Sequence, residues 1–448
     1  MAVAISLHSI CIAVANLLTR YLDPRIAPLL LVNFIGALGY SVILPFLVFL
    51  VQDFGGSAIL YALIASIYPA FQMVGAPLLG RWSDRIGRKR VLLISQVGTF
   101  VSWGIFLIAF ALPVRELFQI ESGTFGLLVI TLPLTILMLA RMVDGLTGGN
   151  ISVANAYLAD ITSPEERKAN YGKLAAAMNV GFIIGPTLSG LLTSLPNGKM
   201  WTVVVAAAIS FVGIFIILWM LPDVQPCDDH DPDHREHLKK ALNAEHTDCH
   251  EDTSDSDTPR PRIWSVPYLG FFLVLYFLIF LVFNFFYATF PIHAADNIGW
   301  SASALGFFFT LLSAVMIFTQ SVLLPRLAER FSDVALFVVG CMILIVSFGS
   351  MAMPITWLVY VAAVCYGLGN GLMWPSFLSL LSTLGNARQQ GEIQGVAGSA
   401  GSLASIFGLI AGGFIFNLVG ADIFWLSAVG IGVIGLLGLR LRGAGEDS

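Results

Sequence analysis

Long apolar stretches alternate with short polar connections along almost the whole chain. Each stretch holds about twenty residues, the length that an α-helix needs to cross a hydrocarbon core ~30 Å thick. The pattern therefore predicts an all-α membrane protein. The twelve predicted transmembrane helices occupy residues 27–51, 58–80, 91–112, 130–158, 169–193, 200–221, 266–289, 303–324, 334–353, 356–381, 393–417 and 421–440.

Composition supports a membrane protein and excludes several other classes. Of the 448 residues, 57% are hydrophobic and 11% are charged, and the mean hydropathy is +0.84. A soluble protein needs a more polar surface than this composition provides. The five cysteines lack the spacing of a metal or disulfide framework, and no GxxxxGK[ST] loop for nucleotide phosphates occurs. We therefore predict no enzyme activity, no cofactor, no metal site in the helices and no nucleic-acid partner.

One polar segment interrupts the apolar pattern in the middle of the chain. Residues 222–265 carry 12 of the 28 acidic residues and five of the seven histidines, and they contain too few large apolar residues to bury a core. We interpret them as a cytoplasmic linker between an N-terminal six-helix bundle, 27–221, and a C-terminal one, 266–440. A cytoplasmic or interfacial segment, 1–26, and a cytoplasmic tail, 441–448, complete the predicted domains.

The histidines of the linker leave two interpretations open. Five histidines and Cys249 lie within 21 residues, and imidazole and thiolate groups can bind transition metals such as zinc. Their spacing is not that of a zinc site, and a tether of about 40 residues also gives two bundles the slack to move. Metal capture and a passive tether are both hypotheses for this segment.

Basic residues lie mostly on one side of the predicted membrane. The connections on that side and the two ends of the chain hold 20 of the 23 Lys and Arg residues, whereas Arg115 and Lys199 lie on the other side. Because Lys and Arg concentrate in cytoplasmic loops, both termini are predicted to be cytoplasmic. A bacterial inner (plasma) membrane is a separate expectation that the charges do not test. Residues 2–19 are compatible with an interfacial helix or with a thirteenth span.

The two halves carry related sequences after their second predicted helices. "LLGRWSDRIG" at 78–87 aligns with "LLPRLAERFS" at 323–332, and the basic and acidic positions correspond. A duplicated bundle of six helices is the architecture of many secondary transporters. The sequence therefore predicts two pseudo-symmetric bundles.

The first of these connections carries an ordered pattern of glycines and charges, made of Gly80, Asp84, Arg85, Gly87, Arg88 and Lys89. A basic loop that only sets topology explains the cations but neither the acid nor the glycines. The pattern closely resembles the loop signature of the major facilitator superfamily, and most of all its drug:proton antiporters of the tetracycline-resistance exporter group. Apart from the linker, the resemblance covers residues 27–440 and implies the fold of that superfamily.

The resemblance also implies a conformational lock at this loop. Gly80 would let two helices approach closely, and Gly87 would permit a turn. Asp84 would face the N-terminal end of the eleventh helix. Arg88 would bridge Asp84 to Asp160 at the end of the fourth helix, and breaking this lock would let the bundles rock.

The fourth predicted helix contains Arg141 and Asp144, the only ionisable pair well inside a predicted span. A central charge costs about 3 kcal/mol to insert, so such residues usually have a function. At i and i+3 they lie on one helical face and can pair. The resemblance links this arginine to proton transfer, which makes Asp144 the candidate proton carrier; a structural ion pair is the alternative. Tetracycline-type exporters have an Asp where Gly36 stands here, so more of the predicted coupling falls on Asp144.

The fifth predicted helix contains the sequence "GFIIGPTLSG". Gly181, Gly185 and Ser189 are four residues apart and form a face for close helix packing, and Pro186 predicts a bend. Gly181, Gly185, Pro186 and Gly190 resemble the antiporter signature of the superfamily. Generic helix packing explains the spacing but not the Gly–Pro pair, so the resemblance implies export.

We therefore expect a proton-coupled antiporter that exports a small amphiphilic molecule by alternating access and works as a monomer in the bilayer. A facilitator or importer of a metabolite, such as a sugar or an organic anion, is the second hypothesis, and a non-transporting sensor is the third. Only the first requires a proton gradient. Candidates for the substrate cavity are the polar and aromatic residues Tyr40, Tyr68, Gln72, Asn284, Asn370 and Trp374.

Overall fold

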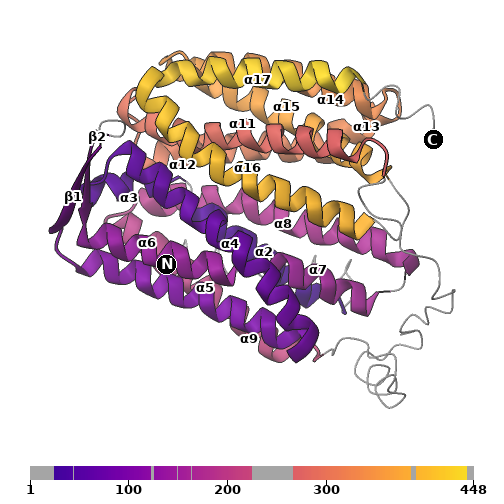
Figure 1. Cartoon of the computed structure of the whole chain (residues 1–448), viewed down its shortest axis with the longest axis horizontal. Helices are drawn as coiled ribbons and strands as arrows, with labels where there is room; N and C mark the ends of the chain where they lie inside the picture. Colours follow the sequence, from indigo (N-terminus) through magenta and orange to yellow (C-terminus); the bar gives the residue numbers. More distant parts are fainter. Residues whose placement is uncertain are drawn as a thin grey trace.

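The computed structural model describes residues 25–43, 45–122, 126–148, 150–162, 164–223, 266–384 and 390–440. Helices occupy each of the twelve predicted ranges (Figure 1). The predicted linker after residue 223, the first 24 residues and the C-terminal tail lie outside the described residues, so the domain boundaries there and the histidine cluster stay predictions.

The elements of the N-terminal half are α2 (Ala27–Ile43), α3 (Leu47–Asp53), α4 (Ala58–Ile86), α5 (Arg88–Ala111), β1 (Glu116–Ser122), β2 (Gly126–Thr131), α6 (Leu132–Thr147), α7 (Asn150–Ile161), α8 (Pro164–Thr193) and α9 (Gly198–Met220). Those of the C-terminal half are α11 (Leu269–Asp296), α12 (Ala302–Phe318), the π-helical turn η2 (Thr319–Leu323), α13 (Leu324–Ala328), α14 (Asp333–Met351), α15 (Thr356–Ser382), α16 (Gln390–Val419), the 3-10 turn η3 (Gly420–Asp422) and α17 (Ile423–Gly438).

Nine helices in the described ranges are long and apolar enough to span a membrane, and the bent pair α2–α3 makes a tenth. The run from α16 through η3 to α17 counts once, although its 44 residues are long enough for two crossings. Helices α6 and α7, of 16 and 12 residues, are each too short to count alone. The prediction of twelve membrane helices is consistent with this arrangement.

Two predicted spans are broken by local sequence. The first bends by 46° between α2 and α3, where Pro45 has no backbone N–H and disfavours a helical conformation of the residue before it. The fourth predicted span, 130–158, is not one helix. It starts at Leu132, because Ile130 and Thr131 belong to β2, and it breaks near Gly148, between α6 and α7.

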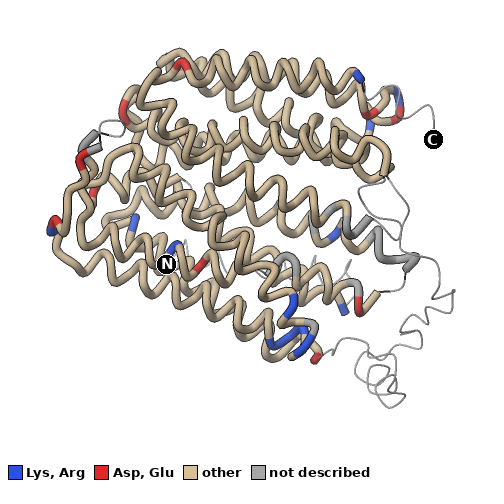
Figure 2. The backbone as a smooth tube through the Cα atoms, viewed as in Figure 1, with Lys and Arg blue, Asp and Glu red and all other residues tan. Residues whose placement is uncertain are grey.

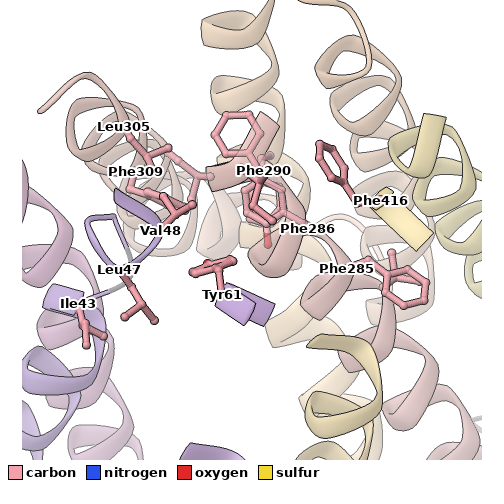
Figure 3. Packing of buried hydrophobic residues seen from close by; sticks show 14 of the residues in the cluster. Ile43, Leu47, Val48, Tyr61, Phe285, Phe286, Phe290, Leu305, Phe309 and Phe416 are labelled. Carbon is pink, nitrogen blue, oxygen red and sulfur yellow. The ribbon is translucent and has the colours of Figure 1, made fainter. Parts of the chain in front are cut away.

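The helices form two bundles, one from each half of the chain (Figure 1). Helix α4 packs on α16, and α8 packs on α12, so these pairs join the halves. Side chains of α3 and α4, including Val48 and Tyr61, point toward Phe286 and Phe309 of the C-terminal half (Figure 3). The Tyr61 hydroxyl donates a hydrogen bond to the Tyr287 carbonyl oxygen at 3.1 Å. This fold confirms the predicted pair of six-helix bundles.

An antiparallel hairpin of β1 and β2 lies between α5 and α6 and was not predicted. Thr131, at its base, donates a hydrogen bond to the Phe54 carbonyl oxygen at 2.7 Å. We call this side of the molecule the hairpin end, and the side that carries residues 81–90 the basic end. Charged residues gather at these two ends, with few between them (Figure 2).

Candidate functional site

A buried ion pair in α6 is the centre of the candidate site. The Arg141 Nη1 atom lies 3.4 Å from Asp144 Oδ2, and the two side chains are 3% and 10% exposed. The i, i+3 spacing therefore produces the predicted pairing. Thr99, on α5, lies beside Asp144. Arg141 Nε is buried and has no hydrogen-bond partner among the described residues. One N–H donor of the guanidinium is therefore unsatisfied beside the ion pair.

Three of the predicted cavity residues gather around this pair. The Arg141 guanidinium carbon lies 4.8 Å from the centre of the Tyr68 ring, in a cation–π arrangement. Gln72 donates hydrogen bonds to the Tyr68 hydroxyl at 3.1 Å and to the Gly148 carbonyl oxygen at 2.8 Å. The Tyr40 ring centre is 4.9 Å from that of Tyr68. Helices α2, α4 and α6 thus contribute one connected group of polar and aromatic side chains.

The close approach of α4 and α6 depends on Gly145. A Cβ atom at this position would lie 2.5 Å from the Tyr68 carbonyl oxygen and 2.8 Å from Phe71 Cβ. Only a residue without a side chain allows the two backbones to come so near. Gly145 is therefore what lets the Tyr68 ring reach the Arg141 guanidinium.

The other three cavity candidates make their described contacts within the C-terminal half. Asn284 donates hydrogen bonds to Ser405 Oγ at 3.0 Å, which links α11 to α16, and to the carbonyl oxygen of residue 280. Asn370 Nδ2 lies 3.5 Å from Met316 Sδ, and the Trp374 ring packs 5.4 Å from that of Tyr276. No described contact joins these residues to the Arg141 group.

The loop signature contains the predicted turn and one half of the predicted bridge. Gly87 links α4 to α5 with φ +98°, a conformation that favours glycine. Arg88 Nε lies 2.8 Å from Asp160 Oδ2, and its Nη1 donates to Ser83 Oγ at 2.6 Å. Arg85 is exposed at the end of α4. The side chain of Asp84 lies outside the described set, so its place in the bridge stays a prediction.

Gly80 has no close packing partner among the described residues. A Cβ atom there would meet no described atom within 4 Å. The predicted close packing at Gly80 therefore stays a prediction. Among the described residues, the halves meet through α4 nearer its start, where Ala62 faces Gly413 of α16.

The antiporter signature makes two different contacts. Gly181 and Gly185 pack on α2, and the Ser41 hydroxyl donates a hydrogen bond to the Gly181 carbonyl oxygen at 3.0 Å. Gly190 faces Gly306 of α12, whose Cα would lie 3.0 Å from a Cβ at Gly190. Helix α8 continues through Pro186 to Thr193. The signature therefore joins α8 to its own bundle on one side and to the other bundle near the hairpin end.

Sequence reasoning missed Ser41, Tyr61, Thr99 and Gly306, which lie in ordinary apolar stretches. The one available signal was the small-residue segment "SASALG" that precedes the centre of α12. A lone small residue predicts close packing only when its partner is known, and the partner Gly190 lies more than a hundred residues earlier.

The structure combines two helical bundles that pack on each other with a buried ion pair in one of them. This combination is typical of a polytopic membrane protein of the secondary-transporter type. The profile of the Major Facilitator Superfamily matches residues 29–409 and 272–447. The chain therefore belongs to the Major Facilitator Superfamily.

Similar proteins support this assignment. The chain is 27% identical over 416 residues to "Tetracycline resistance protein, class D" of Salmonella ordonez, covering 91% of the chain and 94% of that protein. It is 25% identical over 396 residues to "Multidrug resistance protein 1" of Bacillus subtilis (strain 168), covering 87% and 89%. The crystal structure of a D-xylose-proton symporter has the same fold, with a TM-score of 0.70 at 15% identity, covering 92% of this chain and 97% of that one. The resemblance to the tetracycline-exporter group is thus confirmed at the level of the family.

Proposed function

We propose that this protein is a proton-coupled antiporter that exports a small amphiphilic molecule, with Asp144 as the proton carrier and Arg141 as its regulating partner. The observation that carries the proposal is the buried Arg141–Asp144 pair at 3.4 Å. A carboxylate that pairs with a single cation in an apolar helix can take up a proton and release the cation, which couples protonation to local rearrangement. Relatives named for tetracycline and multidrug resistance support export of such molecules.

The surroundings of the pair suit an amphiphilic ligand. Tyr40 and Tyr68 offer aromatic faces beside the ion pair, and Gln72 offers an amide. Binding sites for small molecules usually combine apolar or aromatic surface with a few polar groups. The residues Asn284, Asn370 and Trp374 would complete the site from the other bundle in a conformation that brings the two groups together.

The test is transport in inverted membrane vesicles with tetracycline and a lipophilic cation as probes. One charge moved across ~100 mV is worth about 2.3 kcal/mol, so one proton can sustain roughly a fifty-fold gradient. Each probe that is a substrate should partly collapse a preformed pH gradient. Asp144→Asn should abolish that proton flux, and with it accumulation against a gradient, while leaving the protein folded.

The control is Asp53→Asn, which removes an exposed acid on α3 that pairs with Lys199. It should transport like the wild type. Undiminished accumulation in the Asp144→Asn variant would contradict the role of Asp144. Transport of a sugar or an organic anion that ignores the proton gradient would instead support the facilitator hypothesis.

A further inference from the structure

The β1 strand is amphipathic because of an irregularity in its pairing. Phe118 pairs with Ile130 and Ile120 with Leu128, whereas Glu116 pairs with Thr131, so a bulge lies between Glu116 and Phe118. Successive residues of a strand point to opposite faces, and the extra residue moves Glu116 to the face opposite Phe118.

A side-chain contact supports this separation of the two faces. Gln119 donates a hydrogen bond to Glu116 at 2.8 Å, which places these two side chains on the same face. Glu121, two residues after Gln119, belongs to that face as well. One face of β1 therefore carries Glu116, Gln119 and Glu121, and the other carries Phe118 and Ile120.

The apolar face is only half covered by the protein. Leu128 and Ile130 of β2 are 7% and 9% exposed and belong to the main core. Their pairing partners on the same face, Ile120 and Phe118, are 45% and 51% exposed. The hairpin thus packs on the bundle through β2, and β1 carries the same apolar face beyond the edge of the packed region.

The length of α5 places the hairpin at the border of the membrane. Helix α5 starts at the basic residues Arg88–Arg90 and runs for 24 residues, about 36 Å at 1.5 Å per residue. The hydrocarbon core is ~30 Å thick, with a headgroup layer of several ångströms on each side. Helix α5 also exposes Val97, Val101 and Ile108, as a lipid-facing helix does. Its far end, and the hairpin that follows, therefore lie in the interfacial layer.

The direction of the strands agrees with this position. In Figure 1, β1 and β2 run across the direction of the helices at the hairpin end. A seven-residue strand that pointed along the helices would carry its tip about 20 Å into water. Strands that cross the helix direction instead keep the whole hairpin near one level of the bilayer.

We propose that Phe118 and Ile120 insert into the lipid headgroup–acyl boundary at the hairpin end, while Gln119 and Glu121 face water. The hairpin runs directly into α6, so this contact holds the start of the helix that carries Arg141 and Asp144 at a fixed depth. Lipid fits better than a second copy of the chain. Half of a Phe and half of an Ile expose roughly 200 Å², far below the ~800 Å² per partner of a stable protein interface.

The test places a nitroxide spin label at each position from 118 to 121 in turn. The substitutions F118C, Q119C, I120C and E121C are made in a chain whose five natural cysteines are replaced, and each variant is reconstituted as one copy per phospholipid nanodisc. Collision rates with oxygen, which partitions into lipid, and with a water-soluble nickel chelate report the depth of each label. The ratio of oxygen to nickel collisions should be several-fold higher at 118 and 120 than at 119 and 121.

Labels that are equally accessible to the nickel chelate at all four positions would overturn the proposal. So would alternation that is absent with one copy per nanodisc and develops, with dipolar broadening, only in liposomes that hold many copies, because then a second copy covers the face. The labelled positions are exposed, so folding of each variant is expected and is checked by gel filtration. Neither outcome bears on proton coupling, which is tested separately with Asp144→Asn.

Discussion

At the scale of single residues, two ion pairs, each of a basic residue with an aspartate, differ in how deeply their side chains are buried. The Arg88–Asp160 side chains are 10% and 19% exposed, whereas those of Lys199 and Asp53 are 29% and 53% exposed. Water screens the second pair and solvates either partner when the other is removed. A buried cation that loses its carboxylate keeps the cost of its desolvation. The first pair should therefore contribute more to stability.

Asp160→Asn and Asp53→Asn test this difference. Asp160→Asn should lower the free energy of unfolding by about 1.5–3 kcal/mol, because a neutral amide replaces the carboxylate that Arg88 Nε contacts at 2.8 Å. Asp53→Asn should lower it by less than about 1 kcal/mol. Unfolding by SDS in mixed micelles measures both variants against the wild type. Equal losses would show that burial does not govern the Arg88–Asp160 contact.

At the scale of elements, glycine decides which helices can approach. A Cβ atom at Gly145 would collide with backbone atoms of α4. A Cβ atom at Gly104 of α5 would meet no described atom within 4 Å. The same substitution should therefore have opposite effects at the two positions. In an open position alanine favours the helix by roughly 0.5–1 kcal/mol relative to glycine. In a tight contact the methyl group forces the helices apart.

Gly145→Ala should destabilise the protein by about 1–3 kcal/mol, because its Cβ would lie 2.5 Å from the Tyr68 carbonyl oxygen. Gly104→Ala is the matched control and should be neutral or slightly stabilising. The melting temperature in detergent, followed by the fluorescence of the native tryptophans, compares them. A Gly145→Ala protein as stable as the control would mean that α4 and α6 can separate at little cost.

At the scale of the whole molecule, the two bundles are held together near the hairpin end. Gly190 faces Gly306, Ala62 faces Gly413, and Gln52 donates a hydrogen bond to Asp296 at 2.8 Å. Nearer the basic end, Cβ atoms at Gly80 of α4 and at Gly395 of α16 would meet no described atom within 4 Å. This conformation therefore closes the hairpin end, and the proposed alternating access requires a second state in which these contacts part.

Gly306→Ala should shift the population toward that second state. Its Cβ would overlap the Gly190 backbone, with Gly190 N at 2.8 Å and the Pro186 carbonyl oxygen at 3.3 Å. Overpacking of about 1–3 kcal/mol in one state changes the ratio of two states by roughly 5- to 150-fold. A cysteine at Val48, now buried, should then react several-fold faster with a membrane-impermeant maleimide added from the hairpin end.

The control for this shift is Gly270→Ala near the start of α11, where a Cβ would meet no described atom within 4 Å. It should leave the labelling rate of the cysteine at Val48 unchanged. If Gly306→Ala also left that rate unchanged in a folded protein, the Gly190–Gly306 contact would not hold the hairpin end closed.

The sequence by itself determined the local features, which depend only on residues close together along the chain. A membrane helix needs about twenty consecutive apolar residues, so the twelve predicted ranges could be identified without knowledge of the fold. Gly87 marks a left-handed turn, and the spacing of Arg141 and Asp144 puts them on one helical face. The Arg88–Asp160 pair followed from the resemblance to the superfamily, because no local rule joins residues 72 positions apart.

Only the tertiary structure decided which helices meet, and in which conformation. Tyr40, Tyr68 and Gln72 gather at Arg141 because α2, α4 and α6 pack closely. Gly80 has no close neighbour among the described residues, whose contacts between the bundles lie nearer the other end. The hairpin was hidden for a related reason. A bulge disturbs the alternation of β1, and β2 runs without a charged residue into the apolar start of α6. Apolar residues show which faces of a helix or strand are removed from water. The segment that each face packs against depends on contacts between residues far apart in the sequence.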